Sequence, residues 1–160
     1  MIIFDFNNKE SVSGWFSIND GVMGGISEGK ISHGTDGMIF HGNVSFENNG
    51  GFASVRSKDF KIDLSNFSGL LIEAEGDGKI YKLNTRNSGL SSSINFQQKF
   101  ETGGKIQKYY FPFTEFSANR RGIKVPLMKL DPSKIISFGF MISDKQEGEF
   151  RLTVKSISAY

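Results

Sequence analysis

Few side chains in this chain are able to do chemistry. The sequence has two histidines and no cysteine, which excludes disulfides, thiolate metal sites and a cysteine nucleophile. His33 and His41 lie on either side of the turn signal Asp36-Gly37, and two imidazoles facing each other on a hairpin could bind a metal. No carboxylate motif accompanies the pair. We therefore expect two solvated strand residues and no metal site.

An enzyme would also need a nucleophile with its base, or paired carboxylates in a cleft. Neither pattern is evident in the sequence. Glycine clusters such as Gly103-Gly104 do not lie between a strand and a long helix, so they are not phosphate-binding loops. The sequence therefore predicts a protein that is not an enzyme and that has no cofactor.

Polar residues of three predicted strands form a candidate binding face. They are Ser54 and Arg56, then Lys82, Asn84 and Arg86, and then Asn95 and Gln97. Within each strand these residues share parity and so face one side. If the strands are neighbours, a polar stripe with two arginines crosses one sheet, and arginine suits bidentate contacts with carboxylates or sugar hydroxyls. The alternatives are a face for a ligand or partner strand, and an ordinary solvated face.

The segment NDGVMGG, residues 19–25, is a second candidate. Asp20 can accept backbone hydrogen bonds in a tight turn, and the glycines can adopt positive φ. Only Val22 and Met23 lack such a local explanation. Met23 either plugs the end of the core or is presented outward, where a flexible thioether suits an adaptable contact surface. Both orientations remain open at this point.

The elements that must position these residues are short strands. Turn signals such as Asn49-Gly50-Gly51 and Asp77-Gly78 recur at short intervals, as in sandwiches and barrels. Residues alternate between apolar and polar over 93–100 and 149–156, the period expected of a half-buried strand. Further strands are expected at 38–46, 52–60, 69–76, 79–87, 106–113 and 134–143. We expect a short helix or turn at 114–118, and an irregular loop at 117–133.

Composition supports an all-β protein and one domain, residues 1–160. Phenylalanine supplies sixteen residues, and aromatic residues suit a pleated, half-buried surface. Nineteen basic and seventeen acidic residues are interspersed. No basic stripe is interleaved with aromatics, so nucleic acid is not expected as a partner. The beginning of the chain lacks a signal or membrane-span pattern, and the expected location is cytoplasmic.

The sequence also resembles a known family. The blocks that carry the resemblance are NDGVMGGIS after Trp15, F-x-G-x-V-S-F-E-NNGGFASVRS (40–57), DLSNFSGL (63–70), EGDGKIYKLNTR (75–86), FPFTEF (111–116) and 136–159. They are similar, in order and over essentially the whole chain, to the complex I intermediate-associated protein 30 family. The chain resembles a free-standing, bacterial-type member, without the N-terminal extension of the mitochondrial proteins.

The resemblance implies a galactose-binding-like jelly roll, two antiparallel sheets packed face to face. Mitochondrial members are assembly factors for respiratory complex I, so the resemblance implies a protein partner such as a respiratory-complex subunit or another assembly factor. Such folds sometimes hold structural calcium, for which Asp144, Glu147 and Glu149 are candidates. A solvated hairpin tip is the interpretation that we favour for these three residues.

Carbohydrate-binding modules share this fold, so a sugar ligand is the alternative function. Sugar sites stack a ring on an exposed aromatic, for which Tyr81 or Tyr109 is the candidate. An exposed aromatic beside the arginines would favour sugar, and an exposed apolar rim would favour protein. The candidate binding residues are Asp20, Met23, Arg56, Tyr81, Asn84, Arg86, Asn95 and Tyr109.

Overall fold

The computed structural model describes residues 1–19, 27–45, 51–143 and 146–160, which form strands in two sheets. The strands are β1 (Ile2–Asp5), β2 (Trp15–Asn19), β3 (Glu28–Gly34), β4 (Gly37–Val44), β5 (Ala53–Ser57), β6 (Gly69–Glu75), β7 (Ile80–Asn87), β8 (Ile94–Glu101), β9 (Ile106–Pro112), β10 (Ser117–Arg120), β11 (Ile123–Lys124), β12 (Ile135–Ile142) and β13 (Gly148–Ala159). Three 3-10 turns, η1 (Lys9–Val12), η4 (Phe113–Glu115) and η5 (Pro132–Lys134), are the helical elements of the described residues.

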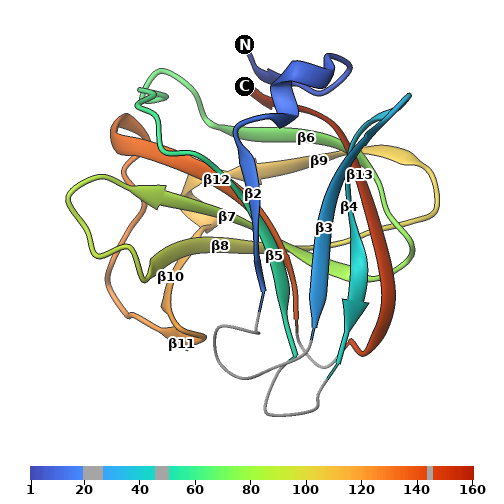
Figure 1. Ribbon diagram of the computed structural model, residues 1–160. Helices are drawn as coiled ribbons and strands as arrows, with labels where there is room; N and C mark the ends of the chain where they lie inside the picture. Colours follow the sequence, from blue (N-terminus) through green and yellow to red (C-terminus); the bar gives the residue numbers. More distant parts are fainter. Residues whose placement is uncertain (20–26, 46–50, 144–145) are drawn as a thin grey trace.

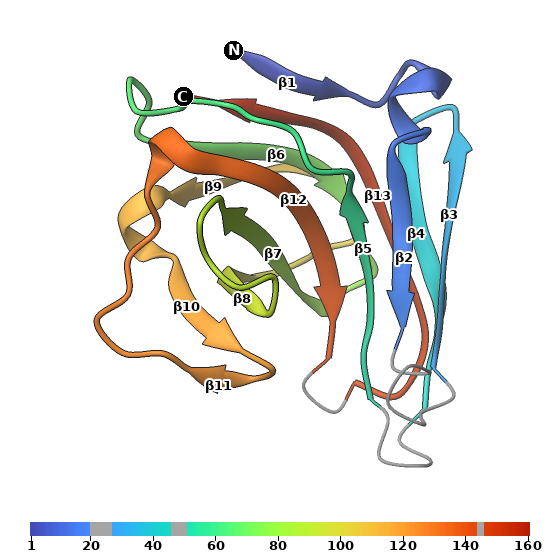
Figure 2. The same cartoon turned by 60° about the vertical axis from the view of Figure 1, so that its left-hand side comes forward.

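The two sheets pack face to face as a β-sandwich (Figure 1, Figure 2). One sheet has the order β3-β4-β13-β6-β9, with β1 pairing β13 as well. The other has the order β11-β10-β8-β7-β12-β5-β2. Every pairing is antiparallel. The all-β fold predicted from the alternation and turn signals, and the jelly-roll sandwich of two antiparallel sheets implied by the resemblance, are both confirmed.

Alternation along the strands places one face of each sheet in the core. In β13, Phe150, Leu152 and Val154 are buried while Arg151 is exposed. The same period governs β8, where Ile94, Phe96 and Phe100 are buried. Because each sheet buries one face, its other face is free to carry polar residues.

Aromatic side chains fill much of the space between the sheets. Phe140 of β12 is fully buried, and its ring stacks on Trp15 of β2, with 6.1 Å between ring centroids and 18° between ring planes. Phe6 meets Trp15 edge to face at 5.5 Å. Aromatic pairs in such geometries contribute beyond the area that they bury, so these contacts tie β2, the edge strand, to the centre of the sandwich.

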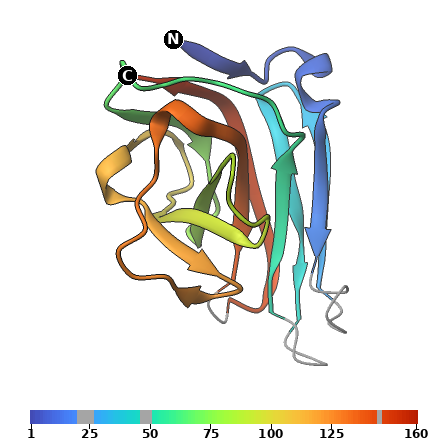
Figure 3. The ribbon, with the colours of Figure 1, turned by 90° about the vertical axis from the view of Figure 1, so that its left-hand side faces the viewer.

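The segment 117–133 is more regular than predicted. Ser117–Arg120 pairs with β8 as strand β10, and Ile123–Lys124 pairs with β10 as β11. The pairing satisfies backbone groups along the β8 edge, and burial of Ala118 on its core side favours it. The expected turn at 114–118 is the 3-10 turn η4, which ends before β10 begins. Figure 3 shows this hairpin extending the seven-stranded sheet at its edge.

No helix in the described segments has the length and apolar character needed to cross a bilayer.

Phe140→Ala tests the role of the aromatic core. We expect the free energy of unfolding to fall by about 3–5 kcal/mol, because a buried ring leaves a cavity that the surrounding strands fill only in part. Ile2→Ala, at a side chain 65% exposed, is the control and should change stability little. Urea unfolding measures both, and equal losses would contradict this packing.

Candidate functional site

One row of side chains crosses the outer face of the seven-stranded sheet. Directly opposed residues of antiparallel strands point to the same face, and one series of opposed residues runs from β2 to β10. The row is Phe16, Arg56, Gly139, Asn84, Gln97 and Ser117. Residues of the opposite parity, such as Val55, Leu83 and Phe140, are buried in the core. The polar stripe suggested by the sequence therefore exists, with β12 lying between the two arginine-bearing strands.

The rows on either side of this one are also polar. Arg86 lies opposite Ser137, and Asn95 lies opposite Asn119. Lys82 and Lys99 lie opposite each other on β7 and β8. We call this whole surface the polar face. It brings together Arg56, Asn84, Arg86 and Asn95, four of the predicted binding residues, on neighbouring strands of one sheet.

Arg86 is the most firmly held cation of the polar face. Its side chain is 8% exposed, and its Nη1 donates to Asp59 Oδ1 at 2.8 Å and to Ser137 Oγ at 3.4 Å. Asp59 itself is 59% exposed. A buried guanidinium needs such a partner because removing its charge from water is costly. The contact fixes the planar head of Arg86 against the sheet.

Arg56 lies between a second cation and an aromatic ring. Its Cζ is 5.3 Å from the centroid of Phe16, within the range of a cation–π contact. Burial lowers the pKa of Arg56 below its ordinary value, the positive charge of Arg86 lowers it further, and Asp59 opposes the shift. Two guanidiniums close enough to shift a pKa make this part of the polar face attractive to an anion or to sugar hydroxyls.

The polar face also contains buried polar atoms that lack a protein partner in the part of the chain that the structure describes. They are Arg56 Nε, Asn84 Oδ1 and Arg86 Nε. Buried polar groups in proteins are nearly always satisfied by protein, water or ligand. Two donors and one acceptor within the same rows therefore mark the centre of the polar face as a surface that water or a ligand completes.

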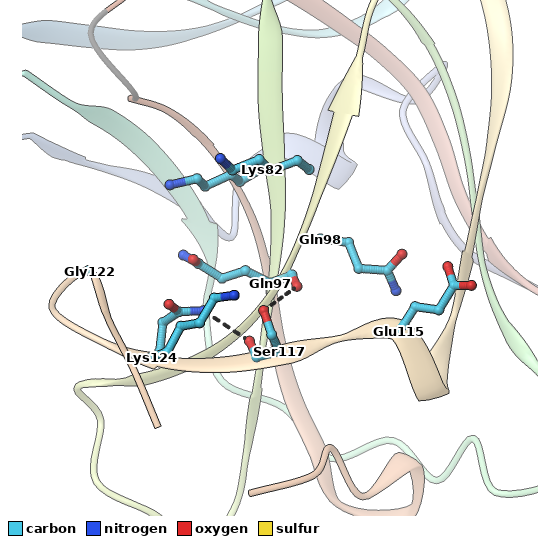
Figure 4. A pocket seen from close by; sticks show the side chains of 9 residues that line it. Lys82, Gln97, Gln98, Glu115, Ser117, Gly122 and Lys124 are labelled. Atoms are coloured by element: carbon cyan, nitrogen blue, oxygen red, sulfur yellow. Dashed lines mark hydrogen bonds between the residues drawn. The ribbon is translucent and has the colours of Figure 1, made fainter. Parts of the chain in front are cut away.

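A hollow of about 510 Å³ lies beside this centre, toward the edge strand β11 (Figure 4). It is lined by Lys82, Gln97, Gln98, Lys99, Glu115, Ser117, Asn119, Gly122 and Lys124. Lys82 and Lys99 bring like charges onto directly opposed positions, which ordinarily destabilises a sheet. Three lysines against one glutamate give the hollow a positive balance.

Tyr81 and Tyr109 do not lie on the polar face, so the proposed stacking role for them is wrong. Tyr81 is fully buried, and its hydroxyl donates to Asp77 Oδ1 at 3.0 Å. Tyr109 belongs to β9 of the other sheet, and its ring packs against the core residue Phe100 at 5.1 Å. The ring of Tyr81 is therefore closed to a ligand, and the partly exposed ring of Tyr109 lies on a different sheet from the arginines.

The two histidines do not form a pair. His33 lies opposite Met38, whereas His41 lies opposite Lys30, so their side chains leave opposite faces of the hairpin. His33 Nε2 contacts the backbone oxygen of Phe6 at 2.7 Å. Residues 1–19, 27–45, 51–143 and 146–160 contain no cluster of three potential metal ligands. Asp144, one of the three candidate calcium ligands, lies outside these ranges.

Asp20 and Met23 lie outside the described residues, as does most of the NDGVMGG segment. Their roles remain predictions. Asn95 lies at the margin of the polar face, next to the core residue Ile94.

The structure adds residues that the sequence did not single out. Phe16 is an exposed aromatic, 39% accessible, beside Arg56. In the sequence, Phe16 is marked only by its position next to Trp15, which places the two side chains on opposite faces of the strand. That Arg56 is its neighbour follows only from the pairing of β2 with β5. Lys99, Asn119 and Lys124 line the hollow because β10 and β11 extend the sheet beyond β8.

Comparison with known proteins finds one family whose model matches most of the chain. Residues 4–154 match the model described as complex I intermediate-associated protein 30. The mitochondrial protein of that name from Mus musculus is 27% identical over 185 residues, which cover 99% of this chain and 56% of the relative. A probable counterpart from Caenorhabditis elegans is 28% identical over 76% of this chain and 42% of its own length. The chain thus spans about half the length of these curated relatives.

Solved structures of similar fold are binding modules and agarases. A family 11 carbohydrate-binding module from Clostridium thermocellum, in complex with a β-1,3-1,4-mixed-linked tetrasaccharide, matches with a TM-score of 0.69 and 16% identity, covering 98% of this chain and 92% of the module. The agarase AgWH50C matches with a TM-score of 0.66 and 11% identity over 100% of this chain and 26% of the agarase. At such identities the likeness shows the fold alone.

Asp59→Ala tests the anchoring of Arg86. We expect the free energy of unfolding to fall by about 1–3 kcal/mol, because a buried charged donor loses its acceptor. The exposed Glu101→Ala removes a similar charge elsewhere and should have little effect. Thermal melts at low and high salt measure both variants, and an unchanged Asp59→Ala protein would show that the pair does not stabilise the fold.

Tyr81→Phe tests the buried phenol. Burial raises the pKa of Tyr81 above its ordinary value of 10.0, and the nearby charge of Asp77 raises it further. Above pH 10 the Tyr81 phenol therefore keeps its proton in the folded protein and loses it in the unfolded chain. Because of this difference, the contribution of Tyr81 to the free energy of unfolding falls as the pH rises past 10. We expect unfolding measured from pH 8 to 11 to show a steeper alkaline loss in the wild type than in Tyr81→Phe. Equal slopes would contradict this.

Proposed function

The chain belongs to the complex I intermediate-associated protein 30 family, and from that premise we propose that it is a non-catalytic binding domain that acts by protein contact. The partner would be a respiratory-complex subunit or another assembly factor. The relatives are named for complex I and for mitochondria. For this chain, both an assembly role and the cytoplasmic location expected from its sequence are part of the proposal.

The observation that carries the proposal is the row Phe16, Arg56 and Asn84 on the polar face. Arginine and aromatic side chains dominate the energetic centres of protein interfaces, where contact excludes water. Here the exposed ring of Phe16 lies against the guanidinium of Arg56. Arg56 Nε and Asn84 Oδ1, which have no hydrogen-bond partner within the described residues, lie beside them. A partner that supplied a carboxylate or a carbonyl to this row would satisfy the arginine donors.

A carbohydrate ligand is the second candidate, and Phe16 is the observation that favours it. A sugar ring can stack on an exposed aromatic while arginine and asparagine bind its hydroxyls. Phe16 and Arg56 provide that combination on the outer face of the sheet, although Tyr81 and Tyr109 do not. The same surface would then be used with a different class of ligand.

Affinity purification of the tagged chain from its native host tests the proposal. We expect a specific protein partner whose capture weakens by about thirtyfold or more in Arg56→Ala, the loss typical of an interface hot spot. Arg151→Ala, an exposed arginine on the other sheet, is the matched control and should retain the partner. Unfolding curves establish that both variants are folded.

A glycan array run on the same proteins separates the two candidates. Retention of the wild-type chain on a glycan, lost in Phe16→Ala, together with recovery of no protein partner, would overturn the protein-contact proposal. If wild type and Arg56→Ala captured a partner equally well, the protein-contact function would stand, but the polar face would not be the surface that binds the partner.

A further inference from the structure

The β10–β11 hairpin at the edge of the seven-stranded sheet and the loop that follows it carry the two most exposed large apolar side chains of the described residues. Leu127 is 99% exposed and Ile123 is 73% exposed. Single exposed apolar residues are ordinary on protein surfaces. Two of this size, four positions apart on one hairpin and its following loop, form a surface feature that requires an explanation.

The surrounding charge is of one sign. Residues 117–130 contain four basic residues, Arg120, Arg121, Lys124 and Lys129, and no acidic residue. All four side chains are exposed, and none has a salt-bridge partner in the described segments. Lys124 also lines the hollow that holds Lys82 and Lys99. We call Ile123, Leu127 and these four cations the basic-apolar hairpin.

The basic-apolar hairpin is held in place from below. Val125 and Met128 pack against the core, Leu130 is buried, and Val125 N donates to the backbone oxygen of Ala118 at 2.9 Å. The exposed side chains therefore project from an anchored segment.

Two residues of the basic-apolar hairpin also have an unusual backbone conformation. Arg121 (φ 50°) and Leu127 (φ 66°) are the non-glycine residues with positive φ among those described. Such conformations are unfavourable for side-chain-bearing residues, and they persist where the surroundings impose them. The chain thus keeps a leucine outward at a position that would suit glycine.

We infer that the basic-apolar hairpin docks the protein onto an anionic lipid surface. Ile123 and Leu127 enter the headgroup region while the four cations meet lipid phosphates, the combination by which peripheral proteins bind membranes reversibly. Charge complementarity selects an anionic occupant. Both apolar side chains are strongly exposed, which suits an interface that can yield around them.

Sedimentation of the purified chain with vesicles tests this inference without any protein partner. We expect binding to vesicles that contain phosphatidylglycerol, little binding to phosphatidylcholine alone, and weakening as salt rises. Ile123→Ser combined with Leu127→Ser should lower the partition coefficient about tenfold. Lys124→Glu combined with Lys129→Glu should lower it by at least as much.

The edge strand of the six-stranded sheet offers matched controls. Ile106 and Tyr110 of β9 are 43% and 59% exposed, and Lys105 and Lys108 lie beside them. Here Glu75 and Glu73 oppose Ile106 and Lys108 across the strand pair, so the charge is balanced. The variants Ile106→Ser with Tyr110→Ser, and Lys105→Glu with Lys108→Glu, should bind vesicles as the wild type does.

The inference would be overturned by no binding to anionic vesicles at low salt, by equal loss in hairpin and control variants, or by binding unaffected by the Ile123 and Leu127 changes. Capture of an acidic protein that depends on the hairpin, without vesicle binding, would also overturn it. Thermal melts of each variant confirm folding, so a loss of binding cannot be attributed to unfolding.

Discussion

The register of β12 between β5 and β7 is the constraint on which the polar face depends. Phe140 lies opposite Val55 and Leu83, and all three are buried in the core. A slip of one residue would exchange the faces of every side chain on the strand, so burial of this aromatic fixes the opposite parity as well. Gly139 then lies between Arg56 and Asn84, and a Cβ there would come within 2.6 Å of the Val55 carbonyl oxygen. Apolar packing on one side of the sheet thus sets which polar groups meet on the other.

Local pattern was enough to predict the strands and the composition of the polar stripe, because alternation is a property of each strand by itself. It was not enough to find Phe16 or the hollow, since these depend on which strands pair, and that is decided by the whole sandwich. The choice of Tyr81 was avoidable. Tyr81 has parity opposite to Lys82 and Asn84, so a face that carries them must turn its ring inward. Tyr109 was less accessible to such reasoning, because it lies on the other sheet. The hairpin of β10 and β11 escaped prediction because strands of four and two residues are too short to show a clear alternation.

Charge on the outer face of the seven-stranded sheet is arranged for contact at some cost to the isolated fold. Lys82 opposes Lys99, and Arg56 lies near Arg86, with Asp59 as a carboxylate that acts on both guanidiniums. Like charges in such positions are unfavourable, and a sheet selected for stability alone would alternate their signs. The outer face of β6 and β9 does so, with Glu73 opposite Lys108. The two outer faces therefore differ. That of the seven-stranded sheet suits anionic or hydrogen-bonding partners, whereas on β6 and β9 opposite charges lie across from each other.

The position of β13 has a consequence for synthesis of the chain. Among the described strands it comes last in the sequence, yet it lies in the middle of its sheet, between β4 and β6 (Figure 1). While the ribosome is still translating residues 148–159, the β3–β4 hairpin and the β6–β9 pair have no strand to join them, and each presents an unpaired edge. Such edges can template pairing with other chains, and contacts between distant segments form slowly. The nascent sandwich therefore stays vulnerable to aggregation until β13 has left the exit tunnel, and over that interval it would benefit most from a holding chaperone.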